Sequence, residues 1–205
     1  MEAASATEVP GPPELAGERA ARIVEAMRVS VAARGIAGAT FDHVAREAGV
    51  SRGLLHYYFG TKERLLVEVV RRECDLRKQR LEQELAAAEG AQDVLGALVR
   101  TFEDFLGEGP TPAVMFYEMT TLAQRNAEIA AELAELGRST RSHLADALRA
   151  KQQAGRLELR VDPDAAALFL FALADGVTMR RLSEPELDIT PLMDQAIPAA
   201  RSVFV

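Results

Sequence analysis

Apolar residues in this chain recur at intervals of three and four, and this period limits the possible folds more than any other feature. No stretch of four or more residues alternates convincingly between apolar and polar over a β-branched run, as a half-buried strand would. We therefore predict an all-α fold. The 205 residues allow one large domain or two small ones, and 48% hydrophobic with 27% charged residues is the balance of a chain that buries a core.

Capping residues and helix breakers divide the chain into successive helices. The proline-rich residues 1–13 are predicted to form a flexible arm, and Gly35 stops the helix that follows them. Thr40, Ser51 and Thr61 suit N-cap positions because a hydroxyl oxygen accepts the free backbone N–H groups there. The helices expected from these signals span about 14–34, 41–48, 52–59, 62–85, 92–106, 112–124, 126–154 and 163–182, with a last helix from 190.

The last helix carries two proline signals. Thr190 and Pro191 are expected to be its N-cap and first position, as Asp162 and Pro163 are for the helix before it. Pro198 is expected to kink or break the last helix, because proline lacks a backbone donor and crowds the preceding turn.

The net charge of −7 is unevenly distributed. Residues 14–80 carry 13 Lys and Arg against 9 Asp and Glu, whereas residues 81–205 carry 11 against 20. A mildly basic N-terminal part on an acidic remainder indicates an anionic partner for the N-terminal part alone.

Other features disfavour export, membrane insertion and metal binding. No apolar run approaches the roughly 18 residues that cross a bilayer, and the N-terminus lacks the basic and apolar regions of a secretion signal. Cys74 is the only cysteine, so neither an intrachain disulfide nor a cysteine-based metal cluster can form. We expect a cytoplasmic protein with no metal and no other cofactor.

The segment from Thr40 to Leu66 has the pattern of a helix-turn-helix. Two short helices are joined by a tight turn over Ala48–Ser51, where Gly49 lets the chain reverse and Val50 fills the angle between the helices. The second helix of such a pair enters the major groove of DNA with its N-terminal side chains near the base edges.

At these residues the chain resembles the TetR/AcrR family of transcriptional regulators. The resemblance implies a DNA-binding domain over 14–66 and a helical domain over 67–205 that dimerises and houses a small-molecule ligand. The residues that carry it are Arg22, Ile23, Ala26, Gly35, Thr40, Val44, Ala45, Ala48, Gly49, Val50, Ser51, Gly53, Leu55, Tyr57, Phe59, Lys62, Glu63, Leu65 and Leu66.

The resemblance also assigns DNA contacts by position. Arg52 is expected either to pair with a guanine or to touch phosphate only, and these two interpretations stay open. Tyr57 and Lys62 match the phosphate contacts of the family, while Leu55, Phe59 and Val44 are expected in the core. The full set of expected DNA contacts is Thr40, Ser51, Arg52, Gly53, Leu54, His56, Tyr57, Tyr58, Thr61 and Lys62.

Aromatic residues and methionines of the C-terminal part are candidates to line a ligand cavity, although for any single one of them a plain packed core is the better explanation, because helical spacing alone produces such stripes. His143 would either give a ligand one polar anchor or lie exposed at the edge of its apolar stripe, and the second interpretation is preferred. Glu118, Arg125 and Asp175 are further polar candidates on weaker grounds. The apolar candidates are Phe102, Phe105, Met115, Phe116, Met119 and Phe169.

The segment 165–174 is apolar on all sides, as expected of a helix that is covered all round. The segment 162–181 also resembles the dimerising helix of many TetR-like proteins. A two-fold subunit interface is the first interpretation, and a central helix of a single subunit is the alternative. The expected interface residues are Phe169, Leu170, Leu173, Val177 and Ile197.

Two other functions compete with regulation. Gly49–Gly53 reads G-x-S-x-G, the pattern around a hydrolase serine, but that motif follows a strand and this one follows a predicted helix. A helical small-molecule carrier without specific DNA binding is the other alternative. We expect instead a homodimeric, non-enzymatic repressor that leaves a pseudo-palindromic operator when a ligand binds.

Overall fold

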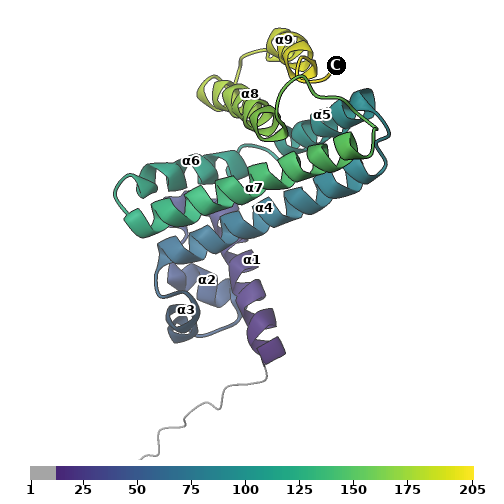
Figure 1. Cartoon of the computed structure of the whole chain (residues 1–205). Coiled ribbons are helices and arrows are strands. Elements are labelled where there is room, and N and C mark those ends of the chain that lie inside the picture. Colours follow the sequence, from purple (N-terminus) through teal and green to yellow (C-terminus); the bar gives the residue numbers. More distant parts are fainter. Residues whose placement is uncertain (1–12) are drawn as a thin grey trace, which may run out of the picture. The chain divides into compact units, whose positions relative to one another are not determined.

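The structure of the chain is a computed structural model that describes the backbone of residues 13–205 and the side chains from Gly17 onward (Figure 1). The expected arm of residues 1–13 lies outside the described residues except for Pro13. The helices are α1 Pro13–Gly38, α2 Phe41–Ala48, α3 Arg52–Phe59, α4 Lys62–Ala86, α5 Ala91–Gly107, α6 Thr111–Ala123, α7 Ala127–Gln153, α8 Pro163–Ser183 and α9 Thr190–Arg201. The all-α prediction is confirmed: the described residues hold no strand, only one isolated bridge between Leu159 and Phe204.

Most helix boundaries follow from the predicted caps. Thr40 and Ser51 accept the backbone N–H of the residue three positions later, at 3.3 Å in both cases, and Asn126 caps α7 in the same way. Gly35 (φ 69°, ψ 170°) leaves the helical conformation inside α1, which is where the sequence predicted a stop.

The structure differs from the sequence-based expectation at two points of the last helix. Thr190 is the first residue of α9 and not its cap; its backbone N–H donates to the carboxylate of Asp188 at 2.9 Å. Pro198 does not break α9, which continues to Arg201. Because Pro198 lies in the last turn, α9 loses only the one hydrogen bond that an N–H at this position would donate to Asp194.

The chain divides into two compact units after Val69, whereas the sequence placed the boundary after Leu66. The head unit comprises α1–α3 and the start of α4, and the body unit comprises Val70–Val205. Fully buried apolar side chains from all four helices fill the head unit; they are Ile23, Met27, Val44, Leu55, Leu65, Leu66 and Val69. Leu55 and Val44 are therefore core residues as expected, whereas Phe59 is half-buried.

In the body unit, α7 packs against α6 and α8, and α9 packs against α8 and α5 (Figure 1). Val94, Leu148, Ala166 and Ala167 lie at the centre of its core. The packing of the C-terminus was not predicted from the sequence. Phe204 and Val203 are buried after α9 ends, and the Arg160 N–H donates to the Val203 carbonyl at 2.9 Å, so the C-terminus is tied to the segment between α7 and α8.

Candidate DNA interface and ligand cavity

The turn between α2 and α3 has the geometry that the sequence predicted. Gly49 adopts the left-handed conformation (φ 66°), and the next N–H, that of Val50, donates to the Ala45 carbonyl at 2.9 Å. Ser51 then begins α3 by accepting the N–H of Leu54. These local bonds fix the direction in which α3 leaves the turn.

One side of α3 is exposed and the other is buried. The side chain of Leu55 is inaccessible, whereas Tyr57 is 77% exposed and packs edge-on against the ring of the half-buried Tyr58 at 5.4 Å between ring centres. Leu54 is also half-buried, and Gly53 and His56 are exposed. An added Cβ at Gly53 would meet only the Ser51 hydroxyl at 3.9 Å, so the backbone here is open to close approach.

Arg52, the first residue of α3, folds back onto α2. Its guanidinium lies 3.3 Å from the Asp42 carboxylate, and both side chains are more than half exposed. An exposed ion pair of this kind is worth about 0–1 kcal/mol. Arg52 can therefore exchange Asp42 for a base or a phosphate at little cost.

His56 is held by its neighbours. Its Nδ1 lies 3.0 Å from the Gly60 carbonyl, and its ring meets that of Phe41 edge-on at 4.8 Å. Because a carbonyl oxygen only accepts, the neutral ring carries its proton on Nδ1 and offers Nε2 as an acceptor. A neutral His56 therefore suits a base amino group, and a contact with phosphate requires the protonated ring.

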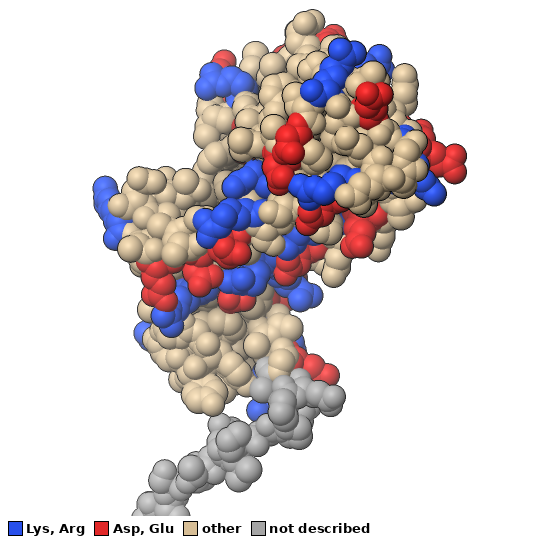
Figure 2. Space-filling view, viewed as in Figure 1, with Lys and Arg blue, Asp and Glu red and all other residues tan. Residues whose placement is uncertain are grey.

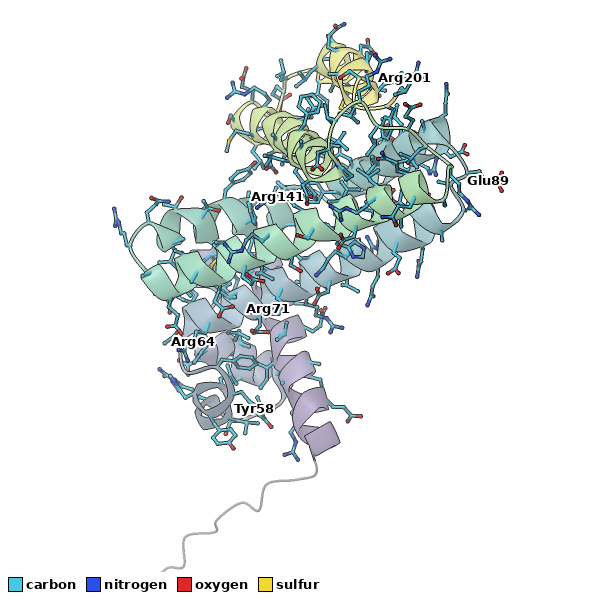
Figure 3. The ribbon with its side chains drawn as sticks, in the orientation of Figure 1. Tyr58, Arg64, Arg71, Glu89, Arg141 and Arg201 are labelled. Carbon is cyan, nitrogen blue, oxygen red and sulfur yellow. The ribbon has the colours of Figure 1, made fainter. Side chains whose placement is uncertain are left out.

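Lys62 is half-buried and has a partner within the head unit. Its ammonium donates to the carbonyl of Ile36 and lies 3.5 Å from that of Ala37, which joins the start of α4 to the end of α1. Thr61 is exposed and accepts the Arg64 N–H at 3.2 Å, and Thr40 is exposed as well. The sequence reasoning left out other exposed cations of the head unit, among them Arg46 near the turn and Arg64 (labelled in Figure 3), which a count of basic side chains near the turn would have found.

The body unit contains a cavity of about 350 Å³ that is partly open to solvent. Five of the seven predicted ligand residues line it: Phe102, Phe105, Met115, Phe116 and His143. The other two do not; Met119 is buried outside the lining, and Phe169 is 42% exposed. Tyr117 and Phe171 complete the aromatic wall, and Asp175 lines the cavity whereas Glu118 and Arg125 do not.

Charged side chains of α4 that the sequence reasoning missed form one wall of this cavity. Arg77 lies 3.4 Å from Glu73 and 2.9 Å from Glu108, and its guanidinium carbon stands 4.7 Å from the centre of the Phe105 ring. Cys74 also lines the cavity, and burial raises the pKa of its thiol although Arg77 opposes this. These residues escaped notice because α4 looked like a plain amphipathic helix.

An exposed face of α8 carries small and apolar side chains. The largest are Leu168, Phe169 and Met179, and Ala165, Ala172 and Gly176 are exposed along the same helix. In Figure 2 the surface over α6 and α8 is largely uncharged, whereas acidic and basic side chains alternate along α7. Of the predicted interface residues only Phe169 lies on this face; Val177 is 2% exposed, and Leu170, Leu173 and Ile197 line the cavity half-buried.

Comparison with known proteins agrees with this geometry. Residues 23–69 match the family described as bacterial regulatory proteins, tetR family, and residues 91–196 match the one described as BetI-type transcriptional repressor, C-terminal. The HTH-type transcriptional regulator BetI of Rhizobium meliloti (strain 1021) is 32% identical over 166 residues, which cover 80% of this chain and 77% of the relative. The chain belongs to the TetR family of transcriptional regulators.

Other members extend the comparison. The HTH-type transcriptional regulator TtgR of Pseudomonas putida is 26% identical over 186 residues, which cover 84% of each chain. A TetR-family structure from Rhodococcus sp. superposes with a TM-score of 0.75 at 25% identity and covers 92% of this chain and 100% of its own. The chain is thus a DNA-binding regulator with the fold of its family.

Family membership favours regulation over the alternative functions. TetR proteins are regulators and not enzymes, and Ser51 of the G-x-S-x-G pattern caps α3 in a helix-turn-helix instead of following a strand. Among the described residues, no three His, Cys, Asp or Glu side chains gather as a metal would require. No helix in the part of the chain that the structure describes is long and apolar enough to span a bilayer.

Proposed function

We propose that this TetR protein is a homodimeric repressor that binds a pseudo-palindromic operator through α3 and leaves it when a small molecule occupies the body cavity. The observation that carries the proposal is the exposed side of α3, where Gly53, His56 and Tyr57 face outward over a fully packed core. A short helix of this kind is suited to the major groove.

A second copy of the chain is the proposed cover of the α8 face. A single α3 reaches too few bases for tight binding, and two-fold symmetry places two such helices about 34–36 Å apart in successive major grooves. Leu168, Phe169 and Met179 are exposed on α8, and their burial against the same face of a partner would contribute to dimer stability.

Helix α4 connects the DNA-binding helices with the proposed ligand site. α4 begins in the head unit, where Lys62 holds it to α1, and its later residues Cys74 and Arg77 line the cavity. A ligand that shifts α4 in the body unit therefore acts on the element that follows α3. Couplings of about 1–3 kcal/mol change affinity 5- to 150-fold, which is sufficient for release.

Related structures support a ligand for the cavity. A structure from Saccharomonospora viridis, 25% identical with a TM-score of 0.67 over 89% of this chain and 95% of its own, is a complex with choline. At 20% identity the structure of FadR from Bacillus subtilis, a complex with stearoyl-CoA, supports the shared fold only. The cavity of this chain, at about 350 Å³, lies within the range of small-molecule sites.

The proposal is tested by selection of DNA from a random pool at physiological salt, with the wild-type protein, Arg52→Ala and Arg138→Ala. Arg138 is a matched control because it is an exposed, ion-paired arginine of α7. We expect a two-fold-symmetric site for wild type and Arg138→Ala, and weaker preference at one base position in each half-site for Arg52→Ala, by about 1–3 kcal/mol. Retention of DNA without a preferred sequence would refute the proposal.

A further inference from the structure

The cavity of the body unit has an apolar part and a polar rim. Phe102, Phe105 and Phe116 belong to the apolar part. At the rim, where α6, α7 and α8 meet, the Tyr117 hydroxyl donates to the backbone carbonyl of Asp175 at 3.2 Å. Arg141 of α7 lies on the side of that helix toward α8 (Figure 3) and lines the same cavity. A ligand that fills the site therefore meets both kinds of surface.

Arg141 differs from its neighbours on α7 in having no partner. Arg138 pairs with Glu135 at 2.7 Å, and Arg149 pairs with Asp164 at 2.7 Å. Arg141 is half-buried, yet among the described residues its guanidinium makes neither an ion pair within 4.0 Å nor a side-chain hydrogen bond. Five N–H donors in a rigid fork are thus free at the wall of a largely apolar cavity.

The position of Arg141 follows from a small residue one turn earlier. An added Cβ at Gly137 would lie 3.3 Å from Nη1 of Arg141, so the missing side chain makes room for the guanidinium along α7. Asp175 lines the same cavity and feels the charge of Arg141, but among the described residues the two side chains form no ion pair. Burial raises the pKa of Asp175, and the charge of Arg141 opposes this shift.

Two further nitrogen atoms at the cavity lack partners. Nε2 of His143 and Nε of Arg77 are buried and form no hydrogen bond among the described residues. Both side chains line the cavity. Unsatisfied buried polar atoms are rare in folded proteins and often mark the place of a bound polar group.

The charged side chains of the cavity wall disfavour a cationic ligand. An aromatic face is the usual partner of an ammonium group, and the guanidinium of Arg77 already lies over Phe105, one of the aromatic rings of the lining. Glu73 is paired with Arg77, and Lys78, a third cation of the lining, is paired with Asp75 at 2.7 Å. A positively charged ligand would meet three cationic side chains and one carboxylate, Asp175, that has no ion-pair partner.

We infer that the effector is an apolar molecule with a single anionic oxygen group, a carboxylate in the simplest case, which Arg141 binds at the cavity rim. This inference rests on the proposed function, since it names the ligand class of the proposed effector site. A cavity of about 350 Å³ holds roughly a dozen non-hydrogen atoms at about 30 Å³ each. The anionic oxygens accept from the Arg141 fork, and the apolar body lies among the phenylalanines.

The test compares three probes of equal chain length on the full-length protein without DNA: decanoate, decanol and decyltrimethylammonium, each below its micelle concentration. Binding is measured by calorimetry for wild type, Arg141→Gln and the matched control Arg138→Gln. Alkylation of Cys74, the only cysteine of the chain and part of the cavity wall, reports whether a probe occupies this cavity.

We expect decanoate to bind wild type at least tenfold more tightly than decyltrimethylammonium and to slow Cys74 alkylation. Arg141→Gln should weaken decanoate about tenfold or more and leave decanol unchanged, and Arg138→Gln should change neither. Asp175→Asn should tighten decanoate binding, because it removes the one carboxylate of the lining that has no ion-pair partner.

Three results would overturn the inference: stronger binding of the cationic probe, equal binding of all three probes, or decanoate affinity that is unchanged in Arg141→Gln. Absence of binding by every probe would overturn it as well. None of these results touches DNA recognition, which the selection experiment tests separately, so failure of the ligand class and failure of the proposed regulator are distinguishable.

Discussion

The head unit and the body unit position their functional residues by different means. In the head unit, bonds between residues three to five positions apart, such as Ser51 to Leu54 and Val50 to Ala45, set the direction of α3. In the body unit, the cavity is assembled from side chains as far apart in the sequence as Val70 and Ala200. A site built by local hydrogen bonds can be predicted from a sequence, whereas a site assembled from residues far apart in the chain cannot.

The two units also differ in how tightly their cores are packed. A test of this difference gives the largest expected effect on stability. Leu55 is completely buried in the head core, while Leu98 borders the cavity of the body unit. We expect Leu55→Ala to cost about 2–5 kcal/mol of the free energy of unfolding. Leu98→Ala should cost clearly less, because one side of its side chain already lacks contacts.

Urea unfolding of both variants, followed by circular dichroism with separate fits for two transitions, measures this difference. Equal losses in the two variants would mean that the body core is as tightly packed around Leu98 as the head core is around Leu55, and the contrast between the units would disappear.

The local structure of the candidate DNA interface could largely be predicted from the sequence, because its residues are consecutive and their caps are local. Its exception is Lys62, whose ammonium bonds carbonyls of α1, 25 and 26 residues away in the chain. The cavity was anticipated in its aromatic part only. Arg77 and Arg141 were missed because their role depends on which ion-pair partners they have or lack in the folded chain. The spacing of apolar residues along a helix does not predict such partners.

The α8 face illustrates the same limit. An apolar run on all sides of a helix does not tell which side meets the core. Val177 belongs to the buried side and Leu168 to the exposed side, although both are aliphatic. Once packing identified the core side, Phe169 was the only predicted interface residue left on the exposed face.

A substitution at Gly53 of α3 should weaken DNA binding without lowering the stability of the protein. Because an added Cβ meets nothing closer than 3.9 Å, Gly53→Ala should leave the stability of the free protein unchanged or raise it by up to about 1 kcal/mol. The same methyl group would stand between the α3 backbone and DNA, and we expect about a tenfold loss of affinity for the selected operator.

Thermal unfolding and fluorescence anisotropy with labelled operator measure the two quantities. Gly107→Ala is a matched control, since this glycine lies at the end of α5 and also has open space around it. Unchanged operator affinity in Gly53→Ala would show that this part of α3 does not approach the bases closely.

The smallest effect is expected at the cavity rim. Burial raises the pKa of Asp175 from its ordinary value of 3.8, and the charge of Arg141 opposes the shift. An acid whose pKa is higher in the folded state contributes most stability below the unfolded-state pKa and loses that contribution as the pH rises through the folded-state pKa. Asp175→Asn should therefore stabilise the protein at pH 7 and have no such effect below about pH 3.5. The gain should stay under about 1 kcal/mol, because the Asp175 carboxylate is only partly desolvated and solvent still screens its charge.

Urea midpoints at the two pH values test this prediction, with Asp146→Asn as the control. Asp146 is an exposed acid of α7 that pairs with Arg149, so its loss should slightly destabilise the protein at pH 7. If Asp175→Asn also destabilised the protein at pH 7, the attraction between Asp175 and Arg141 would outweigh the burial of the carboxylate. Arg141 would then be largely neutralised within the protein, and the cavity rim would be less suited to an anionic ligand.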